Sequence, residues 1–204
     1  GHDYPDAEIL ARQETRVHEL VSGFRGSVDI WDVVNEATVS HRFENAVGRW
    51  IAEHGAAKCV GHALHWAREA NPDATLLYND NKVEGIGAAK SEAFYQLLAD
   101  LKAKDVPIHG CGMQCHFNAA GTGRNRPPTP RMVKQQIHRL GELGLTVNFS
   151  EMDVRVSQLP AEQRHVAQRQ IYHDITSAAL TEPAFDGVWL WGFTDRHTWV
   201  SHFY

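Results

Sequence analysis

The chain has 204 residues, of which 43% are hydrophobic and 22% are charged, with a formal net charge of −5. This length and composition are typical of one globular domain over residues 1–204, and they exclude a disordered or collagen-like chain. The basic residues are scattered, whereas a nucleic-acid-binding surface concentrates Lys and Arg against phosphate. No apolar run approaches the roughly 18 residues that span a membrane. We therefore expect no nucleic-acid partner and no membrane partner.

Helical and strand-like patterns alternate along the chain. In chain order, the sequence predicts a helix over 6–22, a strand over 27–34, a helix over 49–70, a strand over 75–78, a helix over 85–104, a strand over 106–113, a helix over 131–143, a strand over 145–154, a helix over 160–180 and a strand over 185–193. This alternation indicates βαβ units and a parallel sheet. Five such strands form either an open doubly wound sheet or part of a (β/α)8 barrel, because a complete barrel needs about 250 residues.

Polar and aromatic side chains recur where each predicted strand ends. They are Asn35 and Glu36, Asn79 and Asp80, Gln114 and His116, Glu151 and Asp153, and Trp191 with Trp199. The carboxyl ends of parallel strands form the ligand-binding face in α/β proteins. A buried carboxylate is costly without partners, so packing alone does not explain this repeated pattern. We interpret it as a functional face.

Five segments resemble the characteristic segments of family 10 glycoside hydrolases, in the family's order and spacing and over essentially all of the chain. They are WDVVNEA at 31–37, LYND at 77–80, HGCGMQCH at 109–116, FSEMDV at 149–154 and WLWGFTDRHTW at 189–199. The resemblance implies an α/β fold, a (β/α)8 barrel of which this chain covers about the last five strands. It also implies a retaining endo-β-1,4-xylanase.

The resemblance assigns a role to each candidate site residue. Glu36 is the acid/base and Glu151 the nucleophile, while His116 orients the nucleophile within a network that includes Asp153. The expected substrate-binding residues are Asn35, Asn79, Gln114, Trp191 and Trp199. The expected partner is xylan or a xylo-oligosaccharide, with no cofactor and no metal. His62 and His65 lie three apart on a predicted helix, but no further ligand is placed near them by the sequence.

The start of the chain departs from the family pattern. The family places three strand–helix units before the segment that resembles residues 31–37. Of those units, this chain has only the last helix, over 6–22. We therefore expect a missing N-terminal segment or a partner chain to complete the barrel. Asn81 and Lys82 also stand where the family has Tyr-Asn. The family is secreted, and since no leader is seen in the sequence, we expect a signal peptide to be absent or already removed.

Two other functions stay open at this point. The chain could be a catalytically inactive carbohydrate-binding fragment or pseudo-enzyme of the same family, which keeps Trp191 and Trp199 without turnover. The intact Glu36 and Glu151 argue against this alternative. It could also be a structural subunit that reuses the fold, but no feature of the sequence supports that function. The three cysteines, Cys59, Cys111 and Cys115, are expected to be reduced thiols.

Overall fold

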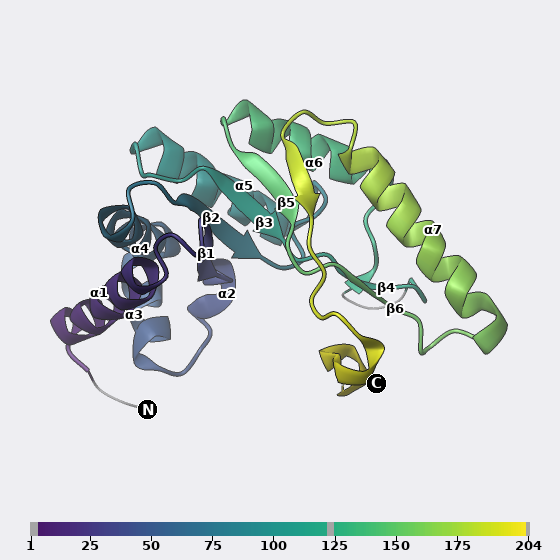
Figure 1. The fold of residues 1–204 in the computed structure, drawn as a ribbon, viewed down its shortest axis with the longest axis horizontal. Coiled ribbons are helices and arrows are strands. Elements are labelled where there is room, and N and C mark those ends of the chain that lie inside the picture. Colours follow the sequence, from purple (N-terminus) through teal and green to yellow (C-terminus); the bar gives the residue numbers. More distant parts are fainter. Residues whose placement is uncertain (1–3, 122–124, 203–204) are drawn as a thin grey trace. The chain divides into compact units, whose positions relative to one another are not determined.

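The computed structural model describes residues 4–121 and 125–202. The elements occur in the order α1 (Asp6–Gly23), β1 (Ile30–Asn35), α2 (Ala37–Ser40), α3 (Ala46–His54), α4 (Ala56–Ala70), β2 (Thr75–Asp80), α5 (Ala89–Ala103), β3 (Gly110–Met113), β4 (His116–Asn118), α6 (Pro130–Glu142), β5 (Thr146–Phe149), β6 (Asp153–Arg155), α7 (Ala161–Ala179) and β7 (Phe185–Val188), followed by the 3-10 turns η2 (Asp195–His197) and η3 (Trp199–His202) (Figure 1). No helix of the described part is long and apolar enough to cross a membrane.

The chain divides into two compact units. The first holds residues 1–80 and 93–111, and the second holds residues 81–92 and 112–204. The division falls inside α5 and inside β3, so both elements contribute residues to each unit. The sequence predicts a single domain, and that assignment stays a prediction.

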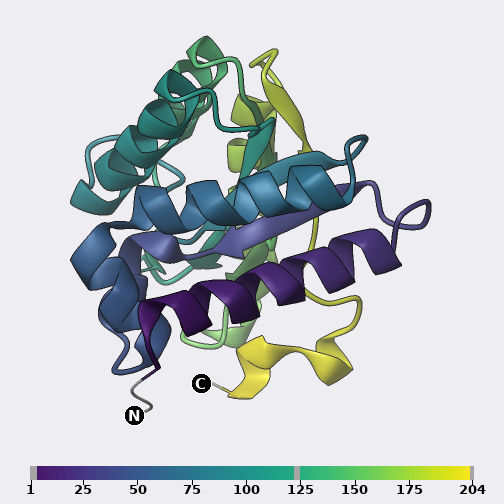
Figure 2. The ribbon, with the colours of Figure 1, turned by 90° about the vertical axis from the view of Figure 1, so that its left-hand side faces the viewer.

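In the first unit, α4 packs against a pair of parallel strands, and α1 packs against α4. β1 pairs in parallel with β2, from Ile30 opposite Thr75 to Asn35 opposite Asn79. Figure 2 shows α1 and α4 lying side by side along these strands, and both helices pack against each other. Trp50, Val60 and other apolar side chains of this unit are almost fully buried. Burial of such side chains is the main source of stability for the unit.

In the second unit, β5 pairs in parallel with β7, and the short strand β4 pairs in parallel with β6. α6 packs against β5 and α7 packs against α6 (Figure 1). Thr129 caps α6 by accepting a hydrogen bond from the Met132 N–H, and Pro130 occupies the first turn, where its missing N–H costs nothing. α6 buries Ile137 and Leu140 completely.

The alternation of helices and strands is confirmed, but several predicted boundaries are wrong. The strand predicted over 27–34 begins at Ile30, because the Ser27 and Val28 N–H groups bond back to the Phe24 carbonyl in a turn. The helix predicted over 49–70 is two helices, because Gly55 adopts φ 87° between them.

The later predicted elements are shorter in the structure for similar reasons. The helix predicted over 85–104 begins at Ala89, after Gly87 at φ 90°. The strand predicted over 106–113 begins at Gly110, because the Val106 N–H bonds to the Leu101 carbonyl at the end of the preceding helix. The strand predicted over 145–154 is interrupted at 150–152, which leaves β5 and β6 as separate strands.

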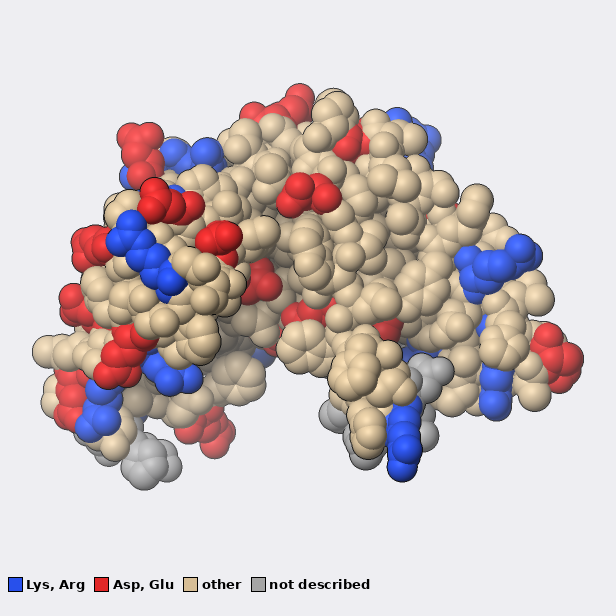
Figure 3. All heavy atoms as spheres, in the orientation of Figure 1, with Lys and Arg blue, Asp and Glu red and all other residues tan. Residues whose placement is uncertain are grey.

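Charged side chains are mixed on the surface. On the face drawn in Figure 3, Lys and Arg side chains lie singly or in small groups among Asp and Glu. The three cysteines are free and buried.

Candidate functional site

Glu36 follows the end of β1 in a strained backbone conformation. Its φ is 58°, in the left-handed region that L-residues with a Cβ rarely adopt, and α2 begins at the next residue. The Glu36 N–H bonds to the Asn79 carbonyl at 2.9 Å. This bond ties the residue after β1 to the end of β2, and strained conformations of this kind concentrate at functional sites.

Two amides from the same unit support this end of the strands. The Asn79 Nδ2 donates to Asn35 Oδ1 at 3.1 Å, and Asn79 is buried. Next to them Asp80, fully buried, accepts hydrogen bonds on Oδ2 from the Thr38 and Tyr78 hydroxyls at 2.6 and 2.5 Å. Burial and the neighbouring Asp80 carboxylate raise the pKa of Tyr78, so this hydroxyl stays a donor. Asn35 and Asn79 are thereby held in a defined geometry.

In the second unit, His116 lies between two carboxylates. Its Nε2 is 3.3 Å from Glu151 Oε2, and its Nδ1 is 2.8 Å from Asp153 Oδ2. The β4–β6 pairing places His116 opposite Asp153, and Glu151 stands between β5 and β6. The sequence order Glu-x-Asp across a strand break therefore presents both carboxylates to one imidazole.

Trp199 completes this cluster. Its Nε1 donates to Asp153 Oδ2 at 2.8 Å, and its ring meets the His116 ring edge-on with centroids 4.7 Å apart. Asp153 Oδ2 therefore accepts from both His116 and Trp199. We call His116, Glu151, Asp153 and Trp199 the imidazole cluster.

The electrostatics of the cluster favour a charged imidazole. Burial disfavours the imidazolium and lowers the pKa of His116, but hydrogen bonds and charge attraction from Asp153 and Glu151 outweigh burial and raise this pKa to about 9. In its charged form the imidazole donates from both ring nitrogens, one to each carboxylate.

The other expected site residues occupy strand ends. Gln114 directly follows β3 and is buried, while Trp191 lies beyond β7 and is 55% exposed. Glu36, Asn35 and Asn79 belong to the first unit, whereas the remaining expected site residues belong to the second. The catalytic and binding roles of all these residues stay predictions.

Two features of the site were missed from the sequence. The hydrogen bond from Trp199 to Asp153 joins residues that are 46 positions apart, and no local sequence pattern predicts it. Glu84 is a buried carboxylate whose Oε1 accepts from the backbone N–H groups of Cys115 and Lys82. The sequence feature that could have identified Glu84 is an acidic residue placed directly after the apolar Val83 in a short loop.

One group of described residues has the geometry to hold a metal ion. Ligand atoms of Asp6, Glu53 and His54, in the first unit, lie within 4.8 Å of one another. His54 Nε2 and Asp6 Oδ2 already lie within hydrogen-bond distance, at 2.7 Å. Within the described part of the chain, His62 and His65 belong to no such group, and His62 stacks on Trp66 with ring centroids 5.4 Å apart. The expectation that the protein needs no metal stays a prediction.

Comparison with known proteins adds a family and several relatives. The model of glycosyl hydrolase family 10 matches residues 2–204. The chain is 37% identical to endo-1,4-beta-xylanase B of Thermotoga neapolitana over all of the chain and 57% of that protein. It superimposes on native xylanase 10B of Thermotoga maritima with a TM-score of 0.86 at 34% identity, covering 100% of this chain and 60% of that one. The same values hold for xylanase 10B of Thermotoga petrophila RKU-1, which was solved with xylobiose. The chain thus spans less than two thirds of these relatives.

Proposed function

Because the chain belongs to glycosyl hydrolase family 10, whose fold is a (β/α)8 barrel, and covers about the last five strands of that barrel, we propose that it cleaves internal β-1,4-xylosidic bonds of xylan with retention of configuration. The observation that carries the proposal is the imidazole cluster, in which His116 contacts Glu151 at 3.3 Å and Asp153 at 2.8 Å. A nucleophilic carboxylate must stay ionised and keep one orientation, and a charged imidazole supplies both conditions.

The proposed reaction has two displacements. Glu151 attacks the anomeric carbon while Glu36 gives its proton to the glycosidic oxygen, so that the aglycone leaves and a glycosyl-enzyme ester forms. Glu36, now a carboxylate, takes a proton from water, and that water displaces Glu151 from the anomeric carbon. Retaining enzymes need the two carboxyl groups about 5–5.5 Å apart. Glu36 directly follows β1, and Glu151 lies in the break between β5 and β6.

The proposed sugar contacts use the amides and indoles at the strand ends. Asn35, whose Oδ1 accepts from Asn79 Nδ2 at the end of β1, is assigned a hydrogen bond to a sugar hydroxyl, and bonds of this kind strengthen in an oxocarbenium-like transition state. Gln114 adds a second buried amide. Trp191 and Trp199 offer flat faces for the apolar C–H surfaces of pyranose rings. The relative solved with xylobiose supports a xylo-oligosaccharide as the ligand class.

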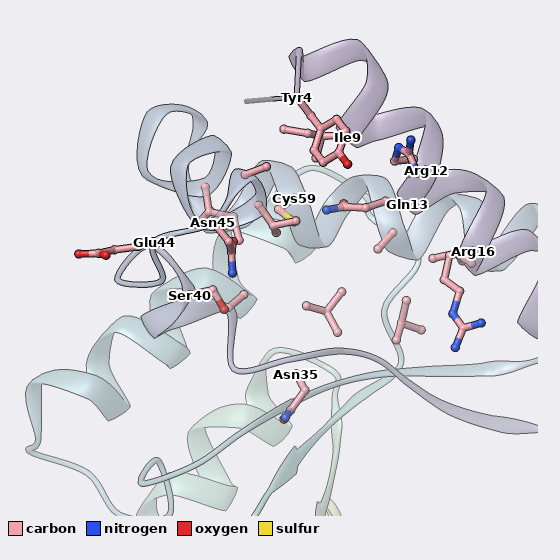
Figure 4. Close-up of a pocket in the computed structure, with 18 residues that line it drawn as sticks. Tyr4, Ile9, Arg12, Gln13, Arg16, Asn35, Ser40, Glu44, Asn45 and Cys59 are labelled. Carbon is pink, nitrogen blue, oxygen red and sulfur yellow. The ribbon is translucent and has the colours of Figure 1, made fainter. Parts of the chain in front are cut away.

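We also propose that strand–helix units outside these 204 residues, preceding them in the same polypeptide, complete the barrel. The first unit carries a cavity of about 730 Å³ that is lined mainly by apolar side chains from α1, β1, α2, α3 and α4, among them Ile9, Val33, Val34 and Ile51 (Figure 4). Among the described residues of this unit, β1 pairs with β2 alone. An open strand edge beside an apolar cavity is normally covered in a stable protein.

Hydrolysis separates the leading proposal from the binding-only alternative. We expect the protein to release reducing sugar from xylan, and Glu151→Ala to abolish this release. Binding of xylohexaose without release by a folded parent protein would favour the inactive alternative. An intact mass well above 22.9 kDa would support the additional barrel units, whereas a functional chain of 22.9 kDa that gains a second polypeptide in solution would favour a separate partner chain.

We further propose that the protein is secreted, because xylan is an extracellular polymer that cannot reach a cytoplasmic enzyme. Detection of the protein in the culture supernatant of its source organism tests this proposal. Recovery from the cell interior alone would overturn it.

A further inference from the structure

Glu84 is a buried carboxylate that the proposed mechanism does not use. It lies in the loop between β2 and α5, in the second unit, and is 6% exposed. Its Oε1 accepts two backbone hydrogen bonds, from the Cys115 N–H at 2.9 Å and from the Lys82 N–H at 3.1 Å. Burial raises the pKa of Glu84, although hydrogen bonds from the backbone N–H groups of Glu84 itself, Cys115 and Lys82 and the charge of His116 oppose the rise. Burying a carboxyl group costs free energy, so the presence of Glu84 at this buried position needs an explanation.

Both residues that donate to Glu84 have left-handed backbones. Among the described residues, four residues other than glycine have a positive φ, and Lys82 at 57° and Cys115 at 60° are two of them. The left-handed conformation costs roughly 1–2 kcal/mol for a residue with a Cβ. One carboxylate oxygen therefore stabilises two strained turns, which come from loops more than thirty residues apart.

The Cys115 turn leads directly to the imidazole cluster. Gln114 and Cys115 separate the end of β3 from His116, the first residue of β4. Its N–H bonds to Glu84, and its carbonyl accepts the Asp153 N–H at 3.3 Å. The orientation of His116 toward Glu151 is thus set by a turn that is fixed on one side by Glu84 and on the other by Asp153.

We propose that Glu84 is a positioning residue. Its carboxylate oxygen accepts hydrogen bonds from the left-handed residues Cys115 and Lys82, stabilises both turns and thereby orients His116 toward Glu151. The importance of this geometry for catalysis rests on the proposed function, but the geometry itself does not. The property that matters is the reach of the side chain to the two N–H groups. We expect an uncharged side chain of the same length to take over this role of Glu84, and a shorter carboxylate to fail in it.

Two variants separate reach from charge. Glu84→Gln keeps the length and an acceptor oxygen, whereas Glu84→Asp keeps the charge and withdraws the oxygen by one methylene. In Glu84→Asp we expect the Cys115 and Lys82 amides to exchange with solvent about tenfold faster or more. We also expect the pKa of His116, measured from its ring resonances, to fall by about one unit or more from its value near 9. Glu84→Gln should change both quantities far less.

A matched control comes from a second buried carboxylate of the same unit. Glu182 is 7% exposed, and its carboxylate oxygens lie 3.0 Å from His138 Nδ1 and 3.4 Å from Lys134 Nζ. None of these residues belongs to the imidazole cluster. Glu182→Asp is expected to lower stability without changing the His116 resonances. This control distinguishes positioning from a general loss of stability.

Several results would overturn the proposal. These are an unchanged His116 titration in a folded Glu84→Asp protein, or a Glu84→Gln protein that is perturbed as strongly as Glu84→Asp. If Glu84→Asp does not fold, Glu84→Gln still decides, since the proposal requires its Cys115 and Lys82 amides to stay as protected from exchange as in the parent. Where the parent cleaves xylan, Glu84→Asp should lower kcat with KM nearly unchanged. A parent that does not cleave xylan would refute the proposed function and leave the resonance test of Glu84 valid.

Discussion

Asp153→Asn tests the electrostatics of the imidazole cluster. Asp153 Oδ2 is 2.8 Å from His116 Nδ1, and with Glu151 it raises the pKa of His116 from 6.5 to about 9 against the opposing effect of burial. The difference between the two pKa values corresponds to a stabilisation on the order of 3 kcal/mol. The variant keeps the burial and removes one of the two attracting charges. We therefore expect the pKa of His116 to fall toward 6.5 in the variant.

The pH range of this stabilisation follows from the direction of the shift. Below pH 6.5 the imidazole is protonated in both the folded and the unfolded protein, so the stabilisation is present in full. Between pH 6.5 and 9 the folded protein holds a proton that the unfolded protein has released, and stability falls as pH rises. Above pH 9 the contribution of His116 is lost.

The assay combines His116 ring resonances with urea unfolding between pH 6 and 9.5. The parent is expected to lose more of its free energy of unfolding across this range than Asp153→Asn, by up to about 3 kcal/mol. Asp6→Asn, which breaks the more exposed His54–Asp6 pair, is the matched control and should leave this pH dependence unchanged. A His116 that still titrates near pH 9 in Asp153→Asn would refute the reasoning.

Three further substitutions test local structure by urea unfolding. Asn45→Ala removes the side-chain oxygen that accepts the Gly48 N–H at 2.8 Å at the start of α3, and should cost about 0.5–2 kcal/mol, whereas Asn45→Ser should recover most of it. Gly48→Ala should destabilise by several kcal/mol, since a Cβ would lie 2.1 Å from the Phe43 carbonyl oxygen and the backbone must move; an unchanged midpoint would contradict this packing. Trp199→Phe removes the donor to Asp153 and should cost about 1.5–3 kcal/mol, with a loss below 0.5 kcal/mol showing that the bond is not made in solution.

The sequence was sufficient to predict the order of elements and the polar ends of the strands, because both depend on local patterns. Apolar runs of period two or 3.6 identify strands and helices wherever the backbone is regular. Asn35 and Glu36 end the predicted first strand, and the structure places them at the end of β1 and directly after it.

The boundaries could not be predicted where backbone geometry overrides the pattern. Apolar and polar residues nearly alternate over 145–154, which predicts one strand, but the chain leaves the strand at Ser150 and re-enters at Asp153, where it pairs with β4 instead. Gly55 lies between two helical patterns, and its positive φ separates the helices. Such features depend on which partner accepts each hydrogen bond, and that choice is made by the fold.

The site contacts depend on long-range geometry in the same way. Trp199 reaches Asp153 across 46 residues, and Glu84 reaches Cys115 across 31. Each side chain has several possible partners in the sequence, so spacing alone does not select one. The family pattern assigned His116 and Asp153 to one network, but it did not include Glu84.

Labelling with a 2-deoxy-2-fluoro xylobioside that carries a dinitrophenolate leaving group tests the central claim most directly. The fluorine slows hydrolysis of the glycosyl-enzyme, so a retaining enzyme accumulates the ester. We expect one equivalent of dinitrophenolate to be released and a single adduct to be found by peptide mass mapping on Glu151, with no adduct in Glu151→Ala. An adduct on another residue, or no release from the folded protein, would contradict the assignment of Glu151 as the nucleophile of a retaining glycosidase.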